Sequence, residues 1–478
     1  MRRLIRAAHI VAFQNGGHVH LRDGVVVTEG DRILHVGPDF EGETDAEIDL
    51  GPGVVTPGLI NTHAHLTSSP LDKSFVEDRG PRQFFLSGLF EFLPARERAM
   101  DEEAAQAAID FSVPELLRMG TTTVMEIGVR GKQVIEAAAR HGLRAYVGEG
   151  IRSGRWFTDD GRQVKYQWFE DDGEAAFQRA VAFCEAHENS HDGLIRTFMT
   201  PSQVDTVSEA MLRRCRAAAT ELGVPLALHT SQSVPEFLEM TRRHGMTPIE
   251  WLNEIGFLGP DVILGHAIIP GESSWANYHA DDIGILADTG TNVAHAVWVF
   301  ARRGIAMESF ARYLARGVNM TIATDTCPQS MLDALRWTAV LSKILDRRTE
   351  IATARDVFDA ATLGGARALG RDDLGRVAPG AKADLILWRG DTLSMAPLRD
   401  PLRNLVYAAD HADIDTVIVD GRVVVEGGRV PGLDEAAVAA RLQAGAERMW
   451  ANLSAGDWAG RDVDALSPQS LPPFRALT

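Results

Sequence analysis

The stretch VVTPGLINTHAHLTSSPLDKSF, Val54 to Phe75, passes from an apolar run through His-Ala-His into a polar loop. Alternate side chains of a strand face the same way, so His63 and His65 would point together from the end of a strand. Two imidazoles that converge from a rigid strand can hold a metal ion or a substrate. The structural alternative is a pair of polar side chains that bond to backbone carbonyls. The fragment alone leaves both interpretations open.

The region after this stretch alternates apolar runs with alanine-rich segments. Two such segments, 131–142 and 208–223, each end in glycine, which is typical of a helix C-terminus. Alternating strands and helices imply parallel pairing. Eight such units predict an α/β fold of the (β/α)8 TIM barrel type. The predicted strands are 58–65, 121–128, 143–150, 194–202, 224–230, 261–267, 291–297 and 318–326.

Both ends of the chain instead have short alternating runs typical of antiparallel strands. Turns are expected at Asp23-Gly24, Glu29-Gly30 and Asp420-Gly421. We expect residues 1–55 and 372–432 to form one small composite β-sandwich domain beside a catalytic barrel of residues 56–371. Residues 433–478 are expected to form a C-terminal helix, from about residue 434 to 453, and a tail.

The composition is that of a globular protein, with 45% hydrophobic and 24% charged residues among 478. A net charge of −18 argues against a nucleic-acid partner and against an anionic membrane surface. The three cysteines, Cys184, Cys215 and Cys327, are far apart, which suits a reducing compartment. The N-terminus lacks a signal-peptide pattern, and no apolar run has the length of a transmembrane helix. We therefore expect a cytoplasmic protein, and the acidity by itself indicates no substrate.

The C-terminal ends of the predicted strands carry polar residues in a regular series. His63 and His65 end the first strand, and His229, His266, His295 and Asp325 end the last four at intervals of 37, 29 and 30 residues. Active sites of such barrels lie at this face. Imidazole nitrogen and carboxylate oxygen suit Zn²⁺, with Fe²⁺ or Co²⁺ as alternatives. Such an ion lowers the pKa of a bound water towards about 7, and Asp325 is placed to take its proton.

Several motifs together resemble the amidohydrolase superfamily, in the branch of triazine chlorohydrolases, aminohydrolases and deaminases. They are TPGLINTHAHL, LHTSQS, LGHA, IATDT and DVFDAATLGGARALGRDDLGRVAPGAKADLIL. The segments SPLDKSFVEDRG and TDTCPQSMLDALR are also similar to hydrolases of phenylurea and thiocarbamate herbicides.

The resemblance implies one divalent metal ion held by His63, His65, His229 and Asp325. It implies that His266 lies beside the substrate or the bound water without being a permanent ligand. A second metal ion held by Glu149 or Glu126 is the alternative. It further implies a homo-oligomer, a dimer or a higher even number of subunits.

The chain departs from this branch at Gln232, where many members carry a glutamate that protonates a ring nitrogen. An amide donates a hydrogen bond but cannot deliver a proton. We therefore expect hydrolysis of a C–N bond in a small, largely apolar amide, urea or carbamate, in which Asp325, His266 and Gln232 act in catalysis. The alternative is a deaminase or dechlorinase of a triazine, pyrimidine or purine. Glu236, or Glu77 or Asp78, would then have to replace the missing acid.

Aromatic residues are frequent in the loops expected on the active face. They predict an apolar wall, and we expect Phe84, Trp298 and His295 to contact the substrate. Each could instead fill the core. A third hypothesis is a barrel that has lost catalysis and serves as a binding protein, although the complete predicted ligand set weighs against it.

Overall fold

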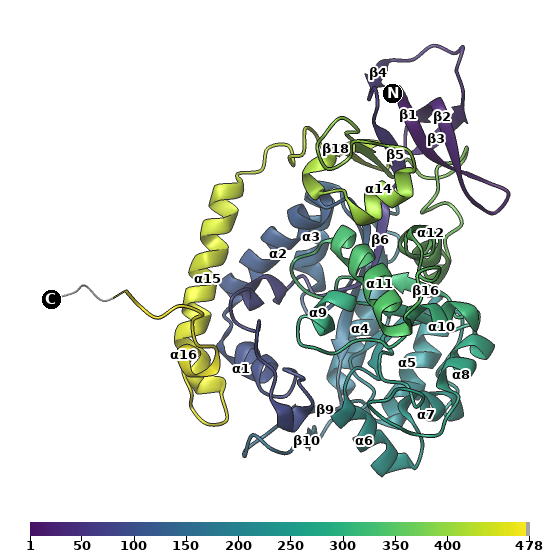
Figure 1. The fold of residues 1–478 in the computed structure, drawn as a ribbon. Coiled ribbons are helices and arrows are strands. Elements are labelled where there is room, and N and C mark those ends of the chain that lie inside the picture. The colour runs from purple at the N-terminus through teal and green to yellow at the C-terminus, as the bar shows by residue number, and fades with distance from the viewer. Residues whose placement is uncertain (475–478) are drawn as a thin grey trace.

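Two parallel sheets form the centre of the molecule, and helices lie around them (Figure 1). The computed structural model describes residues 1–474. The first sheet has the order β11-β8-β7-β6, with β12 paired to β8, and the second has the order β13-β14-β15-β16. Their strands are β6 (Leu59–Ala64), β7 (Thr121–Gly128), β8 (Arg144–Ile151), β11 (Ile195–Thr197), β12 (Thr200–Pro201), β13 (Leu226–Thr230), β14 (Val262–His266), β15 (Asn292–His295) and β16 (Met320–Ile322).

The eight predicted strands of this region are all confirmed. Their residues are buried almost throughout, as expected for parallel strands covered on both faces, which read as continuous apolar runs. Isolated parallel bridges join the two sheets at both junctions, between Ala64 and Asp325 and between Met199 and Leu226. The fold is therefore α/β with parallel sheets.

The predicted helices are also present. α3 (Gly131–His141) and α5 (Glu209–Leu222) end at Gly142 and Gly223, whose φ values of +78° and +67° are left-handed and favour glycine. The other α-helices are α1 (Phe92–Ala99), α2 (Glu102–Arg118), α4 (Glu174–His187), α6 (Val234–His244), α7 (Pro248–Glu254), α8 (Asp282–Thr289), α9 (Val297–Ala301), α10 (Phe310–Ala315), α11 (Met331–Asp346), α12 (Ala354–Asp359), α13 (Gly365–Ala368), α14 (Pro401–Tyr407), α15 (Glu435–Gly456) and α16 (Val463–Leu466). There are also three short 3-10 helices, η1 (Ser69–Asp72), η2 (Arg82–Phe84) and η4 (His411–Asp413), and one π-helix, η3 (Ala360–Gly364). No helix within residues 1–474 combines the length and the apolar character needed to cross a membrane.

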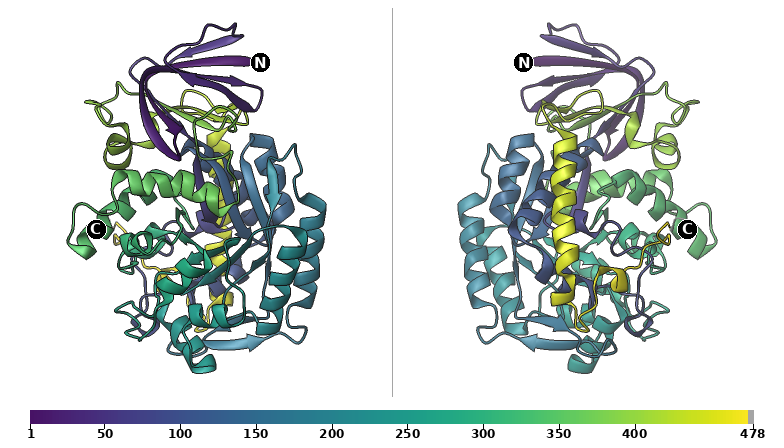
Figure 2. Two further views of the ribbon diagram at one scale, coloured as in Figure 1. Left: turned by 90° about the vertical axis from the view of Figure 1, so that its right-hand side faces the viewer. Right: turned by 90° about the vertical axis from the view of Figure 1, so that its left-hand side faces the viewer.

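The two ends of the chain share one eight-stranded sheet, which lies at one end of the molecule (Figure 2). Its order is β19-β18-β17-β5-β1-β2-β3, with β4 paired to β1. All eight strands belong to one hydrogen-bonded sheet. The boundaries expected for this domain, residues 1–55 and 372–432, stay a prediction. Its strands are β1 (Arg2–Gln14), β2 (Gly17–Glu29), β3 (Arg32–Gly37), β4 (Ala46–Asp49), β5 (Val54–Pro57), β17 (Leu385–Trp388), β18 (Ile414–Val419) and β19 (Arg422–Val425), and a separate hairpin joins β9 (Gly154–Phe157) and β10 (Lys165–Trp168).

Two of the three predicted turns in this sheet are confirmed, because β2 ends at Glu29 and β18 and β19 flank Asp420-Gly421. The predicted turn at Asp23-Gly24 is wrong. β2 runs through it, and Gly24 pairs with Ala7 of β1. The neighbouring strand β1 pairs with β2 both before and after Asp23-Gly24, and these pairs outweigh the local preference for a turn. The chain reverses instead at Asn15-Gly16, a favourable pair for a two-residue hairpin.

The C-terminal helix α15 packs along α1 and α2 (Figure 2). Leu442, Met449 and Leu453 share a core with Phe92 of α1. A Cβ atom at Gly445 would lie 2.9 Å from the Cα atom of Ala104, so glycine permits this close approach. The helix therefore supports α1, whose other side borders the cavity described below.

Candidate metal centre and active site

The C-terminal ends of three central strands bring the four predicted ligands together. His63 lies in β6 with His65 directly after it, His229 lies in β13, and Asp325 follows β16. The amide of Asp325 donates to the carbonyl of His63 at 2.9 Å, and the amide of His65 donates to the carbonyl of Asp325 at 2.8 Å. Two backbone hydrogen bonds thus fix Asp325 against the first strand, far away in sequence.

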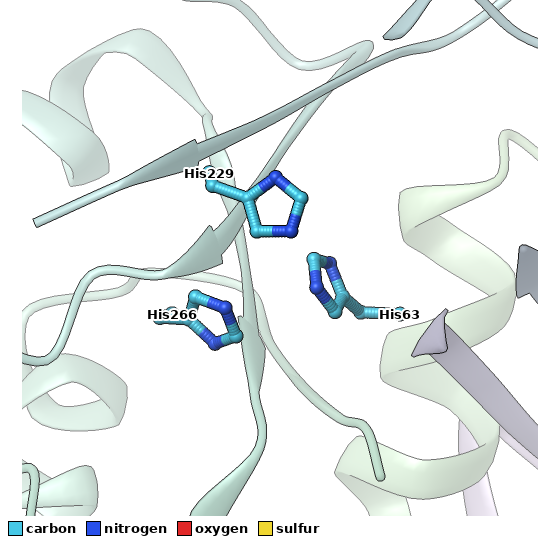
Figure 3. Close-up of side chains that lie close together, drawn as sticks. All are labelled: His63, His229 and His266. Carbon is cyan, nitrogen blue, oxygen red and sulfur yellow. The ribbon is translucent and has the colours of Figure 1, made fainter. Parts of the chain in front are cut away.

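The side chains converge as closely as their backbones. Asp325 Oδ1 lies 3.3 Å from His65 Nε2 and 3.4 Å from His63 Nε2. His65 Nε2 and His229 Nε2 are 3.2 Å apart. The rings of His63, His229 and His266 face one another (Figure 3). Two groups could hold a metal ion with atoms within 4.8 Å of one another, one of His63, His229 and His266 and one of His63, His65 and Asp325.

The hydrogen bonds of the imidazoles indicate which nitrogens face inward. His65 Nδ1 donates to the carbonyl of Ile127 at 2.6 Å, and His229 Nδ1 donates to that of Ser202 at 2.5 Å. The two Nε2 atoms therefore present lone pairs to each other, and that of His65 also faces Asp325 Oδ1. Both ring nitrogens of His63 are buried with no hydrogen-bond partner in residues 1–474. Lone pairs that face a carboxylate need a cation between them, so this donor set fits Zn²⁺ or a similar ion.

Burial keeps these imidazoles in the neutral form that binds metals. It lowers the pKa of His63 to about 3 and that of His65 to about 4. Burial, with the nearby His63, also lowers the pKa of His229 well below its usual value. At neutral pH all three present free lone pairs.

Steric contact with a ligand explains the glycine of the LGHA motif, Gly265. A Cβ atom at Gly265 would lie 2.5 Å from His63 Cε1, so only glycine leaves room for this ring. The next residue, His266, has a left-handed φ of +89°, and Asp325 has a φ of +63°. Such strained conformations in residues other than glycine cluster at functional sites.

A cavity of about 540 Å³ opens onto the centre. His65, His229, His266, Gln232 and Asp325 all line it, so the predicted catalytic residues lie together. Apolar side chains form much of the remaining wall, among them Leu89, Leu93, Ile127, Val299, Phe300 and Ile305.

Gln232 has its Nε2 buried without a hydrogen-bond partner among the described residues. Glu236 does not line the cavity. One of its carboxylate oxygens accepts from the amide of Ser231 at 2.5 Å, and burial raises its pKa well above the usual value. Glu77 accepts from Arg302 Nη1 at 2.9 Å and does not line the cavity either. Neither carboxyl stands in place of the missing glutamate.

The three residues expected to contact substrate lie outside the cavity lining. Phe84 packs against Phe90, Trp298 packs against Trp337, and His295 packs against Phe310 with its pKa lowered by burial to about 4. Phe84 and His295 are buried, and Trp298 is half-buried. Their role as substrate contacts stays a prediction.

The carboxylates considered for a second metal ion bind backbone amides instead. Glu126 accepts from Leu66 at 3.2 Å, and Glu149 accepts from Gly131 at 2.8 Å. Neither belongs to the candidate metal groups found in residues 1–474.

Charged residues of the cavity wall were missed in the sequence. Arg96 donates to Asp72 at 2.6 Å, Arg152 lies 3.4 Å from Glu97, and Arg303 also lines the wall. Charge in a long loop usually marks a solvated surface, so no sequence signal distinguished these residues.

The amidohydrolase family model matches residues 54–424. A 5'-deoxyadenosine deaminase from Methanothermobacter thermautotrophicus is 30% identical over 434 residues, which cover 90% of this chain and 95% of the relative. A zinc-bound adenosine deaminase from Xanthomonas campestris has a TM-score of 0.78 at 25% identity, covering 94% of this chain and 98% of that one. A triazine hydrolase from an Arthrobacter aurescens source has the same fold, with a TM-score of 0.80 at 23% identity, covering 93% and 99%. The chain is therefore a metal-dependent hydrolase of the amidohydrolase family.

Proposed function

We propose that this enzyme removes an exocyclic amino group, or an equivalent leaving group, from a nitrogen heterocycle. The observation that carries the proposal is the convergence of His63, His65, His229 and Asp325 beside His266 at one cavity. The relatives named as deaminases match nearly the full length of the chain, which favours this alternative over our first expectation of an acyclic substrate.

We assign one divalent ion, Zn²⁺, to His63, His65, His229 and Asp325. When bound, it would supply a Lewis acid that makes hydroxide available near neutral pH. Asp325 takes the proton of the attacking water on its carboxylate and returns it to the departing amine. His266 steadies the developing negative charge by a hydrogen bond. Gln232 donates its free amide N–H to a ring nitrogen.

A second candidate is hydrolysis of an acyclic urea, amide or carbamate, and Gln232 favours it. Deamination of a ring is helped by protonation of the ring nitrogen, which an amide cannot perform. An acyclic carbonyl needs a proton only for its leaving amine, and Asp325 supplies that proton in either reaction. Loss of a positioned acid costs about 10²- to 10⁴-fold, so the difference is measurable.

The test is turnover of a mixed library by zinc-replete protein, read by mass spectrometry. The library holds aminated and chlorinated heterocycles together with ureas, carbamates and anilides. Ammonia or chloride released from a ring supports the proposal. Turnover of ureas or carbamates alone supports the second candidate. A Gln232→Glu variant should speed ring substrates selectively. Absence of metal and of all turnover would favour a binding protein.

The bridges at both junctions of the parallel sheets support our proposal that residues 56–371 close into a (β/α)8 barrel. We also propose a cytoplasmic homo-oligomer with an even number of subunits. Light scattering of the purified protein tests its assembly.

A further inference from the structure

Arg303 is a cation of the cavity wall that pairs with no carboxylate of residues 1–474. It follows α9 in the loop after β15. Three other arginines of the wall have acidic partners: Arg96 with Asp72, Arg152 with Glu97 and Arg130 with Glu102. Within residues 1–474, Arg303 forms no ion pair of 4.0 Å or less, and its Nε is buried without a hydrogen-bond partner.

The preceding residue shows how differently two adjacent arginines are used. Arg302 Nη1 donates to Glu77 at 2.9 Å and to the carbonyl of Cys327 at 3.4 Å, and its Nη2 donates to Thr326 Oγ1 at 3.3 Å. These contacts tie Arg302 to the structure. Arg303 has none of them and faces the cavity instead.

An unpaired guanidinium in a partly desolvated cavity wall costs free energy. Burial, with the charge of Arg302, lowers the pKa of Arg303 to about 10, so it remains a cation at neutral pH. Asp72, Asp325 and Glu77 lie near enough to affect it but form no ion pair with it. Arg303 is half-buried and opens onto the cavity, so a molecule that fills the cavity would shield this charge from solvent and would need to supply its partner.

We propose that Arg303 binds a carboxylate that the substrate carries away from the C–N bond to be cleaved. The planar fork of a guanidinium matches a carboxylate through two parallel hydrogen bonds. Arg303 is thus a specificity residue for a substrate with an apolar body, which contacts Phe300 and Ile305, and an anionic end. The inference rests on the proposed function only in that the substrate occupies this cavity.

The test compares ligands that differ only in this charge. One pair is adenine with a carboxyalkyl chain on its imidazole ring and the matching carboxamide. The other is para-ureidobenzoate and para-ureidobenzamide. Zinc-loaded protein should bind each carboxylate about 10- to 100-fold more tightly than its amide, as measured by calorimetry. Arg303→Met should abolish the preference, and Arg303→Lys should keep part of it.

Arg399→Met is the matched control, because Arg399 is exposed and lies outside the cavity lining. It should keep the preference. Equal affinities in the wild type, no binding of either carboxylate, or a preference that survives Arg303→Met would overturn the inference. The wild-type comparison stands even if Arg303→Met fails to fold.

Turnover of the same ligands separates this inference from the proposed function. A preference that depends on Arg303 without hydrolysis of any ligand keeps the anion site and counts against the reaction. Hydrolysis of the adenine pair with no charge preference keeps the reaction and removes the anion site.

Discussion

A single methyl group at Gly265 should weaken zinc binding without replacing any of the proposed ligands. The added Cβ would lie 2.5 Å from His63 Cε1 and 2.8 Å from His63 Nδ1. Carbon atoms in contact are about 3.5–4.0 Å apart, so the ring or the strand must move by about 1 Å. Metal sites tolerate errors in ligand distance of only about 0.2 Å. We expect Gly265→Ala to weaken zinc binding by at least about 10- to 100-fold, as loss of a supporting contact does.

The assay measures zinc content after dialysis and zinc affinity by competition with a chelator, beside thermal unfolding. Overpacking a core costs about 1–3 kcal/mol, so the metal-free variant should also unfold at a lower temperature. His63→Ala combined with Gly265→Ala should recover that stability and still bind zinc poorly, because the clash is gone but a ligand is missing. Gly17→Ala is the control, since its Cβ meets only the flexible end of Arg355 at 3.1 Å. Wild-type zinc affinity in Gly265→Ala would refute the reasoning.

Asp325→Asn should lower kcat by about 10²- to 10⁴-fold on any substrate, because the amide cannot shuttle a proton; a variant that keeps its zinc and its kcat would exclude this role. The metal-free protein should lose stability as pH falls from about 6.5 towards 4. The pKa values of His63 and His65, about 3 and about 4 in the folded chain, lie below the unfolded value, so the unfolded state binds more protons in this range. A melting temperature of the metal-free protein that does not change between about pH 6.5 and pH 4 would contradict this prediction. Arg144→Met should destabilise the protein by about 3–5 kcal/mol in urea unfolding, since it leaves Asp384 buried without its bonds of 3.0 and 3.2 Å; an unchanged midpoint would show that the pair contributes little.

The parts of the fold that follow from local pattern could be predicted, and those that depend on long-range packing could not. The alternation of side chains along a strand predicted that His63 and His65 point to the same side. The regular spacing of the strand ends predicted that His229, His266 and Asp325 lie on the same face. The turn at Asp23-Gly24 failed because the partner strand β1 continues past it.

The wall of the site was harder to predict than its centre. An aromatic side chain can pack in the core or line a cavity for the same reason, which is its large apolar surface. The sequence of a loop therefore does not tell whether Phe84 or Trp298 faces the cavity or a neighbouring ring. Arg302 and Arg303 are identical neighbours in the sequence. Only the tertiary position of Glu77 determines that one is neutralised and the other is not.

The local charge of the cavity differs from that of the whole chain, and this bears on the reaction. The protein carries a net charge of −18, yet the five arginines of the cavity wall are balanced by four carboxylates of the wall and by Glu102, which pairs with Arg130, before a divalent ion is added. The arginines are Arg96, Arg130, Arg152, Arg179 and Arg303, and the carboxylates are Asp72, Glu97, Asp171 and Asp325. Attack of hydroxide moves its negative charge onto the substrate in the transition state. Arginines fixed near the reacting atoms stabilise the shifted charge more than they stabilise the ground state, which is the condition for catalysis. The overall acidity of the chain therefore does not argue against an anionic substrate, because the charges nearest to the substrate dominate the electrostatic potential in the cavity.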